Sequence, residues 1–313
     1  MTRILKVAAA QLGPIQRAEG RAQVVERLIA MLHQAHGMGC HLVIFPELAL
    51  TTFFPRYWME DQAEVDAFFE TAMPNPATQP LFDEAARLGV GFYLGYAELT
   101  QEIGTPRHFN TSILVDDDGN IVGKYRKVHL PGHSNHIPDV AFQHLEKRYF
   151  EVGDLGFPVW NAFEGVMGMC ICNDRRWPET FRVMALQGAE MVVLGYNTPT
   201  TNIHHDEPLH LRMFHHRLCM QAAAYQNGMW VVGTAKAGKE DGHGLYGGSC
   251  IVAPTGEIVA QAMTEGDEVI TYTCDLDLGN YIKNTIFNFE EHRRIEHYGL
   301  ITERTGVVPP EDA

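Results

Sequence analysis

The amino-acid sequence predicts an α/β fold in which a mixed sheet, or a pair of sheets, is covered by helices. Short apolar runs alternate with segments of helical periodicity, which is the pattern of strand and helix units in one core. Two pairs of β-rich runs are joined by turn sequences, and such hairpins argue against a purely parallel sheet. Because no repeat, low-complexity tract or linker divides the chain, we predict a single domain over residues 1–313.

The first half of the chain alternates strand-like and helical segments. A strand over about 4–11 precedes a helix over about 21–36, where apolar residues recur at helix-face spacing. The run HLVIFPE indicates a buried strand ending near Glu47, and a helix over about 80–88 leads to the strand GVGFYLGYAEL. In TSILVDDDGNIVGKYRKVHL, the turn Asp-Asp-Asp-Gly-Asn joins two β-rich runs and predicts a hairpin.

The second half continues with a strand over about 166–171, a helix from Pro178 to about Gln187, and the strand EMVVLGYN. A long helix over about 208–226 and the strands MWVVGTA and EVITYTCDL follow, with SCIVAPTGEIVAQAM as a second hairpin. Residues 131–154 are His-rich and lack a clear period, and loops of this length are often functional. The charged tail at 281–313 is either a surface extension or an arm that packs on a partner subunit.

Composition limits the classes of partner and compartment. The formal charge of -15 argues against a nucleic-acid partner, which would require a basic face. No apolar stretch approaches the roughly 18 residues of a membrane span, so we expect no membrane partner. Six cysteines are too few for a disulfide scaffold, and the N-terminus is typical of a strand rather than a signal peptide. We therefore expect a cytoplasmic protein with reduced thiols.

Cys172 is a candidate nucleophile. It lies in MCICNDRRWPE, where an apolar strand breaks into polar residues before a Trp-Pro-Glu that can open a helix. Nearby cations and a helix N-terminus lower a thiol pKa, and the following backbone N–H groups can face an oxyanion. The alternative is an inert, buried strand cysteine, which Cys170 fits better because apolar residues enclose it.

Glu47 and Lys127 complete a possible acyl-transfer set. Hydrolysis of an amide requires a nucleophile, a proton shuttle and a positive group beside the developing oxyanion. Glu47, at the end of a buried strand, suits the general base, and Lys127 in KYRKVHL suits the cation. Taken alone, Glu47 could equally be a capping or ion-pair carboxylate, and Lys127 a solvated cation, and their spacing does not prove that they meet.

The motifs FPEL, YRKVHLP and CNDRRWPE, in this order, resemble the Glu-Lys-Cys motifs of the nitrilase superfamily of carbon-nitrogen hydrolases. PELALTTFFPR, FNTSILVD, FQHLEKRYFEVGDLGFPV, GYNTPT, YQNG and SCIVAPTGEIVA closely resemble its N-carbamoyl-D-amino acid amidohydrolases, from Val7 to about Leu300. The resemblance implies a four-layer α-β-β-α sandwich and pairing of subunits into a homodimer or homotetramer. It also implies Cys172 as nucleophile, Glu47 as base and Lys127 as oxyanion stabiliser, with Glu146 orienting Lys127 or the substrate.

The resemblance further assigns Arg175 and Arg176 as anchors for a substrate carboxylate, which a guanidinium binds through paired hydrogen bonds. It adds other residues around the substrate, namely His129, His144, Asn173, Asn197 and Thr198. Because adjacent residues seldom point the same way, one of the two arginines could instead hold the loop, and both could be solvated charges.

The function expected from this resemblance is hydrolysis of N-carbamoyl-D-amino acids to the D-amino acid, ammonia and carbon dioxide, without a metal or organic cofactor. A β-ureidopropionase or an aliphatic amidase is the nearest alternative. A metal-dependent amidohydrolase is disfavoured, because the 16 histidines include no HExxH and their adjacent pairs would diverge on a helix. A binding protein without chemistry is disfavoured by the intact Glu47, Lys127 and Cys172. Preference for the D enantiomer follows from the resemblance alone.

Overall fold

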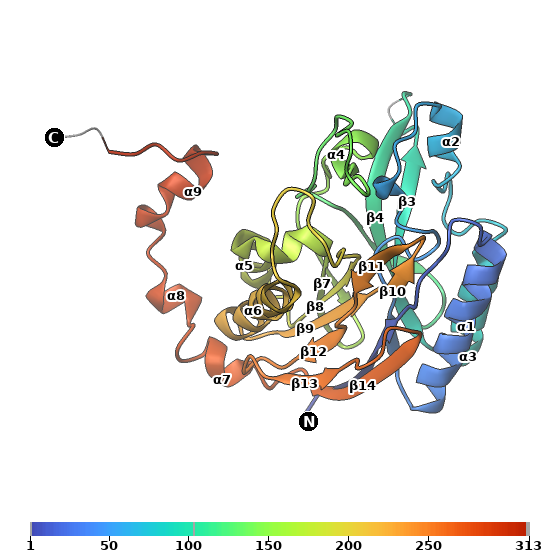
Figure 1. Cartoon of the computed structure of the whole chain (residues 1–313). Coiled ribbons are helices and arrows are strands. Elements are labelled where there is room, and N and C mark those ends of the chain that lie inside the picture. Colours follow the sequence, from blue (N-terminus) through green and yellow to red (C-terminus); the bar gives the residue numbers. More distant parts are fainter. Residues whose placement is uncertain (1, 103, 311–313) are drawn as a thin grey trace.

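Two six-stranded sheets form the centre of the computed structural model, which describes residues 2–102 and 104–310 (Figure 1). The first sheet has the strand order β14-β1-β2-β3-β4-β5, in which β1, β2 and β3 are parallel and the other pairs are antiparallel. Its strands are β1 (Ile4–Gln11), β2 (Leu42–Ile44), β3 (Gly91–Thr100), β4 (Arg107–Val115), β5 (Ile121–Arg126) and β14 (Glu268–Asp275).

The second sheet has the order β13-β12-β9-β8-β7-β6, in which β7, β8 and β9 are parallel. Its strands are β6 (Val159–Ala162), β7 (Gly165–Ile171), β8 (Met191–Tyr196), β9 (Trp230–Ala235), β12 (Cys250–Val252) and β13 (Ile258–Gln261). A separate hairpin consists of β10 (Ala237–Glu240) and β11 (His243–Tyr246). Both predicted hairpins are present, whereas β6, β10 and β11 were not predicted, because their short runs carry little apolar periodicity.

Helices cover the outer faces of both sheets, which gives the four layers α-β-β-α (Figure 1). Helices α1 (Arg21–Gly37) and α3 (Gln79–Leu88) pack on the first sheet, and α5 (Pro178–Leu186) and α6 (Leu209–Asn227) pack on the second. The shorter helices of the body are η1 (Phe54–Arg56), α2 (Gln62–Asp66), α4 (Glu146–Tyr149) and η2 (Cys172–Arg176). The predicted α/β sandwich is therefore confirmed, with the long elements close to their predicted bounds.

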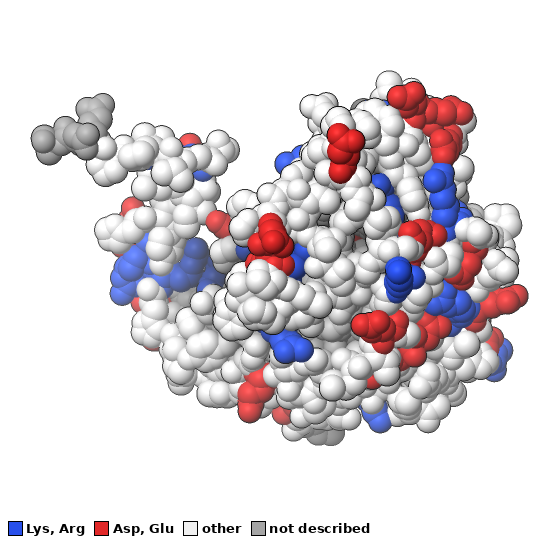
Figure 2. Space-filling view, viewed as in Figure 1, with Lys and Arg blue, Asp and Glu red and all other residues white. Residues whose placement is uncertain are grey.

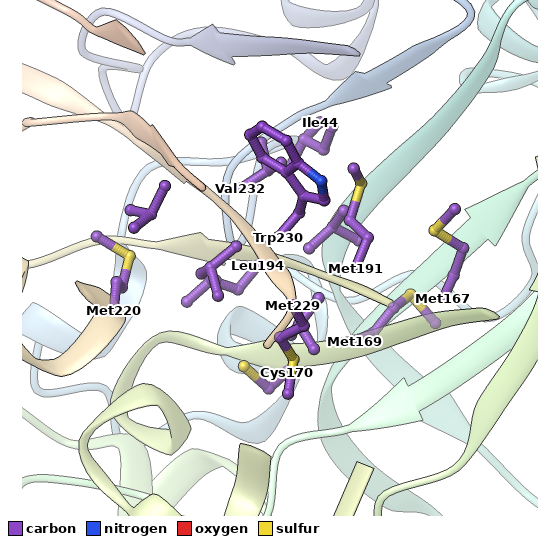
Figure 3. Close-up of a cluster of buried hydrophobic side chains, with 14 of the residues drawn as sticks. Ile44, Met167, Met169, Cys170, Met191, Leu194, Met220, Met229, Trp230 and Val232 are labelled. Carbon is purple, nitrogen blue, oxygen red and sulfur yellow. The ribbon is translucent and has the colours of Figure 1, made fainter. Parts of the chain in front are cut away.

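The main core lies where the two sheets face each other. Along β1, Leu5, Val7 and Ala9 belong to this core, whereas the alternate residues Ala8 and Ala10 face α1 and α3, as the period of a strand requires. From the second sheet come methionines and other large apolar side chains, among them Met167, Met169 and Trp230 (Figure 3). Burial of this apolar surface holds the strand ends, and hence the loops that follow them, in a fixed arrangement.

The end of the chain forms an arm that leaves the body beside α6 (Figure 1). It contains α7 (Asn280–Lys283), α8 (Phe289–His292), η3 (Ile295–His297) and α9 (Gly299–Glu303). Ile282 of α7 is buried, but α8, η3 and α9 bury no residue. A gap of about 800 Å³ separates the arm from α5 and α6, and Figure 2 shows the arm standing off the body.

Among the described residues, no helix is both long and apolar enough to cross a membrane.

Candidate active site

Glu47 follows β2 and is fully buried between the two sheets. Its Oε1 accepts hydrogen bonds from Asn110 Nδ2 at 2.8 Å and Lys127 Nζ at 2.7 Å, and its Oε2 accepts from the backbone N–H of Asn197 at 2.8 Å. Asn197 also donates its side-chain amide to the carbonyl of Glu47 at 2.8 Å. Both carboxylate oxygens are therefore fixed by groups from β4, from the end of β5 and from the end of β8.

Two glycines allow the strands to approach the backbone of Glu47. A Cβ at Gly195 of β8 would lie 2.2 Å from the nitrogen of Glu47, and one at Gly95 of β3 would lie 2.7 Å from its Cα. Real Cβ atoms essentially never show such contacts with backbone, so any residue other than glycine would force the main chain to shift. The two glycines thus leave the space that the main chain of Glu47 occupies between the sheets.

Lys127 lies directly after β5 and is also fully buried. Its ammonium bridges Glu47 Oε1 at 2.7 Å and Glu146 Oε2 at 2.5 Å. Burial alone lowers the pKa of Lys127, but the nearby Cys172, Glu146 and Glu47 raise it well above its usual value. Burial raises the pKa of Glu146, and the charge of Lys127 more than reverses this, so that the pKa is lowered. Lys127 is thus held as a cation.

Cys172 is the first residue of η2, one position past the end of β7, and is 7% exposed. Its φ of 47° lies in the left-handed region, which is strained for a residue with a Cβ. Burial and the charge of Glu47 raise the pKa of Cys172 to about 11, although Lys127 and Arg175 oppose this. The resting thiol is therefore protonated at neutral pH, and a neighbouring base must remove its proton before it can attack a carbonyl.

Asp174, two residues after Cys172, fixes the loop that contains Cys172. This fully buried carboxylate accepts hydrogen bonds from Tyr125 OH at 2.7 Å, from Ile171 N at 3.1 Å, and from His129 N at 2.9 Å. His129 Nδ1 lies 2.8 Å from the same carboxylate, and its ring stacks on Trp177 at 4.8 Å. Such a network stores the strain at Cys172 because it holds the residues on either side of it.

A cavity of about 220 Å³ opens above Cys172. Most of the predicted substrate-contacting residues line it, namely His144, Asn173, Arg175, Arg176, Asn197 and Thr198. His129 does not line it; its backbone carbonyl accepts a hydrogen bond from Asn173 Nδ2 at 3.1 Å, so it supports the loop from behind. Glu47, Lys127 and Glu146 are fully buried and do not line the cavity either. His144 connects the cavity wall to the buried cluster, because it lines the cavity while its Nε2 lies 3.2 Å from Glu146 Oε1.

The two predicted arginine anchors have different surroundings. Arg175 is 2% exposed and donates to the carbonyl of Cys172 at 2.6 Å, to Tyr246 OH at 2.9 Å and to Thr198 Oγ1 at 3.2 Å. Arg176 is exposed at the rim of the cavity. Both arginines thus line the cavity, but Arg175 uses its N–H groups for hydrogen bonds within the protein.

Sequence reasoning missed three residues of this region, Asn110, Asp174 and Arg212. Asn110 lies in the quoted motif FNTSILVD, but nothing in a strand of polar and apolar residues shows that its amide reaches a carboxylate 63 positions earlier. Asp174 was visible beside Cys172, where an Asp after a strand is a common capping residue. Arg212 lines the cavity from the first turn of α6 and gave no local signal.

Within residues 2–102 and 104–310, no group of three or more His, Cys, Asp or Glu side chains is arranged to hold a metal ion. The two histidines that meet near the cavity, His133 and His204, are 3.2 Å apart and have no carboxylate or thiol completing a ligand set.

The chain resembles known proteins over most of its length. The carbon-nitrogen hydrolase family model matches residues 6–283. N-carbamoylputrescine amidase of Solanum lycopersicum is 33% identical over 88% of this chain and 87% of that protein, and citrullinase of Francisella tularensis is 29% identical over 87% and 89%. A carbon-nitrogen hydrolase from Helicobacter pylori has the same fold, with a TM-score of 0.80 at 23% identity over 96% of this chain and 99% of that one. The chain belongs to the carbon-nitrogen hydrolase family of the nitrilase superfamily.

Proposed function

We propose that the protein hydrolyses N-carbamoyl-D-amino acids to the D-amino acid, ammonia and carbon dioxide, with Cys172 as nucleophile. One observation carries the proposal: a buried thiol lies beside a Glu47–Lys127–Glu146 cluster, at the base of a cavity whose walls hold arginines. The cluster suits cleavage of a carbon-nitrogen bond, and the arginines suit a substrate with a carboxylate.

In the first half of the reaction, Glu47 takes the proton of the Cys172 thiol, and the thiolate attacks the carbamoyl carbon. Negative charge then develops on the carbamoyl oxygen, where the ammonium of Lys127 and the backbone N–H of Asn173 stabilise it. When the tetrahedral intermediate collapses, protonated Glu47 gives its proton to the departing nitrogen, and ammonia leaves. The product of this half is a thiocarbamate ester between Cys172 and the amino acid nitrogen.

In the second half, Glu47 removes a proton from water, and the resulting hydroxide attacks the same carbon. Collapse of the second intermediate breaks the carbon-sulfur bond, and the Cys172 thiolate regains its proton from Glu47. The released N-carboxy amino acid loses carbon dioxide and leaves the free amino acid. Lys127 is suited to both steps, because its raised pKa keeps its charge through the whole cycle.

The relatives support the reacting group and leave the rest of the substrate open. The name N-carbamoylputrescine amidase describes a substrate with a carbamoyl group on nitrogen, which is the group that the proposed reaction attacks. Putrescine, however, ends in an ammonium, which the cavity arginines would repel, and for this reason we favour a substrate ending in a carboxylate. The D configuration is part of the proposal through the sequence resemblance alone.

Ammonia release from four compounds tests this function. N-carbamoyl-D-alanine should be hydrolysed faster than N-carbamoyl-L-alanine, and both faster than N-carbamoylputrescine and ethylurea, which lack the carboxylate. Equal rates on the two enantiomers would remove the D assignment. A preference for N-carbamoylputrescine would instead place the protein with its plant relatives.

We also propose that two copies pair, with the arm of one packing on the other. The arm carries apolar residues that the described part of the chain leaves exposed, among them Ile295 (70% exposed), Leu300 (57%) and Ile301 (58%). Across the 800 Å³ gap, α5 and α6 expose Leu186 and Leu218, and α6 also exposes Phe214 outside the lining of the gap. A two-fold pairing places such patches together, because each copy contributes both surfaces to a self-complementary interface.

Light-scattering mass in solution tests this pairing. The full chain should have at least twice its monomer mass, and Phe214→Glu or removal of residues after Asn288 should lower the mass toward the monomer. Ile121→Glu, on an exposed apolar residue of β5, is the matched control and should leave the mass unchanged. A monomeric full chain at micromolar concentration would contradict the proposal.

A further inference from the structure

Arg212, in the first turn of α6, is a buried cation that the reaction described above does not use. It is 6% exposed and lines the cavity above Cys172 together with Arg175 and Arg176. Three guanidinium groups around one small cavity raise the question of which of them meets the substrate. The answer depends on how many of their N–H groups are already bound.

Arg175 has almost no free donor. Its Nη1 donates to the carbonyl of Cys172, its Nη2 to Thr198 Oγ1 and Tyr246 OH, and its Nε lies 3.2 Å from His216 Nδ1. A guanidinium has five N–H groups, and four are occupied here. Its face also packs over the ring of Tyr196 at 4.5 Å. These contacts are those of a positioning residue that holds the carbonyl of the nucleophile.

His216 completes this positioning. Burial, followed by the charge of Arg175, lowers the pKa of His216 well below its usual value, so the ring is neutral. A neutral ring can accept from Arg175 at Nδ1 while it donates from Nε2 to the carbonyl of Gly248 at 3.1 Å. Arg175 is therefore held by groups from η2, from the segment after β8, from α6 and from β11, and it cannot turn toward a ligand without breaking these contacts.

Arg212 differs from Arg175 in this respect. Among the described residues, neither Nε nor Nη1 of Arg212 has a hydrogen-bond partner, although both atoms are buried. The nearest carboxylate is Glu207, whose Oε2 lies 3.8 Å from Nε, and whose other oxygen is bound to His215 Nδ1 at 2.8 Å. A buried guanidinium with unbound N–H groups is costly unless a ligand satisfies it, because its lost hydration has no replacement.

The charges around Arg212 favour an anion. Burial lowers the pKa of Arg212, and the positive charge of the nearby Arg176 lowers it further. Glu207, which also lines the cavity, balances one of these two cations and leaves the other unbalanced. A carboxylate has one negative charge and two acceptor oxygens, which suits an excess of positive charge beside the unbound donor nitrogens of Arg212.

We propose that Arg212 is the principal anchor of the substrate carboxylate, that Arg176 assists it from the rim, and that Arg175 does not touch the substrate. This inference rests on the proposed function, since it assumes a substrate with a carboxylate. Of the two anchors expected from the sequence, it keeps Arg176 and replaces Arg175 with a residue 37 positions later on another element. It also separates specificity, which belongs to α6, from chemistry, which belongs to the ends of β2, β5 and β7.

Binding and turnover of Arg212 variants test the inference. In a Cys172→Ala background, which binds substrate without turnover, Arg212→Met should weaken N-carbamoyl-D-alanine binding by about 10- to 100-fold, as loss of a hydrogen-bonded charge does. Ethylurea binding should weaken much less. Arg212→Lys should recover part of the loss. Arg217→Met, on the same helix and outside the cavity lining, is the matched control and should leave the dissociation constant unchanged. Calorimetry measures the dissociation constant of each ligand for each variant, and thermal unfolding checks that each variant is folded.

Steady-state kinetics separates the arginines. With Cys172 present, Arg212→Met should raise KM for N-carbamoyl-D-alanine more than it lowers kcat, whereas Arg175→Met should lower kcat because the carbonyl of Cys172 loses its donor. If Arg175→Met raised KM in the way expected of Arg212, and Arg212→Met had no effect, the inference would be overturned while the proposed function stood. If the Cys172→Ala protein bound N-carbamoyl-D-alanine no better than ethylurea, the proposed function itself would fail.

Discussion

Lys127 and Lys236 are both fully buried lysines paired with glutamates, yet their surroundings differ in charge. Lys127 contacts two carboxylates, those of Glu47 and Glu146. Lys236 follows β9, and its Nζ lies 3.0 Å from Oε2 of Glu240. The other carboxylate oxygen of Glu240, Oε1, accepts a hydrogen bond from Arg56 at 2.8 Å. The first cluster therefore has one carboxylate more than its cations, and the second has one cation more than its carboxylate.

The two lysine pKa values differ accordingly. Burial lowers the pKa of Lys236, and Glu240 does not fully compensate, whereas the pKa of Lys127 is raised well above its usual value. In the second cluster every group has a structural partner: Lys236 donates to the carbonyl of Thr51 at 2.8 Å, and Glu240 accepts from the N–H groups of Phe53 and Ile15. The second cluster therefore binds the loop that follows Glu47 to the end of β9 and to β10.

The comparison shows what a buried ion pair needs in order to take part in chemistry. A carboxylate that is matched by two cations and by backbone N–H donors, like Glu240, is committed to contacts that hold the fold. Glu47 shares its lysine with Glu146 and lies beside a thiol, so one proton can be added to the cluster without leaving a cation unpaired. Excess negative charge is thus the feature that distinguishes the cluster proposed to react, here called the reactive cluster, from the structural one.

The largest expected effect is on turnover by Glu47→Gln. Removing the base should lower kcat for ammonia release by about 10²- to 10⁴-fold, since the amide cannot carry the proton between thiol, ammonia and water. Glu240→Gln is the matched change in the other cluster and should retain most of the kcat of the folded protein while lowering its stability. Similar kcat losses in both variants would mean that charge excess does not separate the clusters.

Lys236→Met should mainly lower the free energy of unfolding. The ammonium of Lys236 makes two buried contacts, with Glu240 and with the carbonyl of Thr51. Hydrogen bonds of a charged group contribute about 1.5–3 kcal/mol each, and both are lost in the variant. Urea unfolding followed by circular dichroism measures this change. Arg17→Gln breaks an ion pair with Glu64 in which both side chains are largely exposed, and it should cost less than about 1 kcal/mol. A loss of that small size for Lys236→Met would show that the second cluster is not structural.

The long elements and the order of the motifs could be predicted from sequence, because apolar periodicity and turn residues are local properties. They place Glu47, Lys127 and Cys172 at the ends of β2, β5 and β7, where the sandwich brings strand ends together. Local patterns do not reveal the partners that decide the role of each group. Arg175 and Arg176 are adjacent in sequence, but one is saturated and the other is exposed at the rim.

Lys236 and Glu240 illustrate the same limit. In TAKAGKE, closely spaced charges between two β-rich runs indicate a solvated turn, yet both side chains are fully buried. Their burial arises because the loop after Glu47 packs over β10, a contact between residues about 190 positions apart. The place of Arg212 in the cavity could not be predicted for a related reason. The cavity is lined both by Arg212 and by residues of the segment 199–207, and no local pattern shows that they meet.

The pH dependence of stability should report the thiol in the reactive cluster. The pKa of Cys172 is raised from 9.0 to about 11 in the folded protein, so between these values the unfolded chain has released a proton that the folded chain keeps. Stability present below pH 9 is therefore lost as pH rises toward 11, by about 2–3 kcal/mol for this group. Urea unfolding under reducing conditions at pH 8 and pH 10.5 should show a smaller loss for Cys172→Ala than for the unchanged protein. Cys170→Ala serves as a comparison, and an equal loss in the unchanged protein and Cys172→Ala would contradict the raised pKa.

Gly195→Ala disturbs the reactive cluster without touching the other, and it is the smallest of the four changes. The new Cβ would lie 2.2 Å from the nitrogen of Glu47 and 2.4 Å from the carbonyl carbon of Pro46, and backbone atoms cannot rotate away as a side chain can. Such overpacking costs about 1–3 kcal/mol of stability and shifts the carboxylate relative to Lys127. Gly37→Ala, at the end of α1, has no atom within 4 Å of the new Cβ and serves as the control. Because a small displacement of a base impairs proton transfer more than it impairs folding, kcat of Gly195→Ala should fall by a larger factor than its folding equilibrium constant. The reverse ratio would show that the position of Glu47 tolerates movement and that charge alone distinguishes the two clusters.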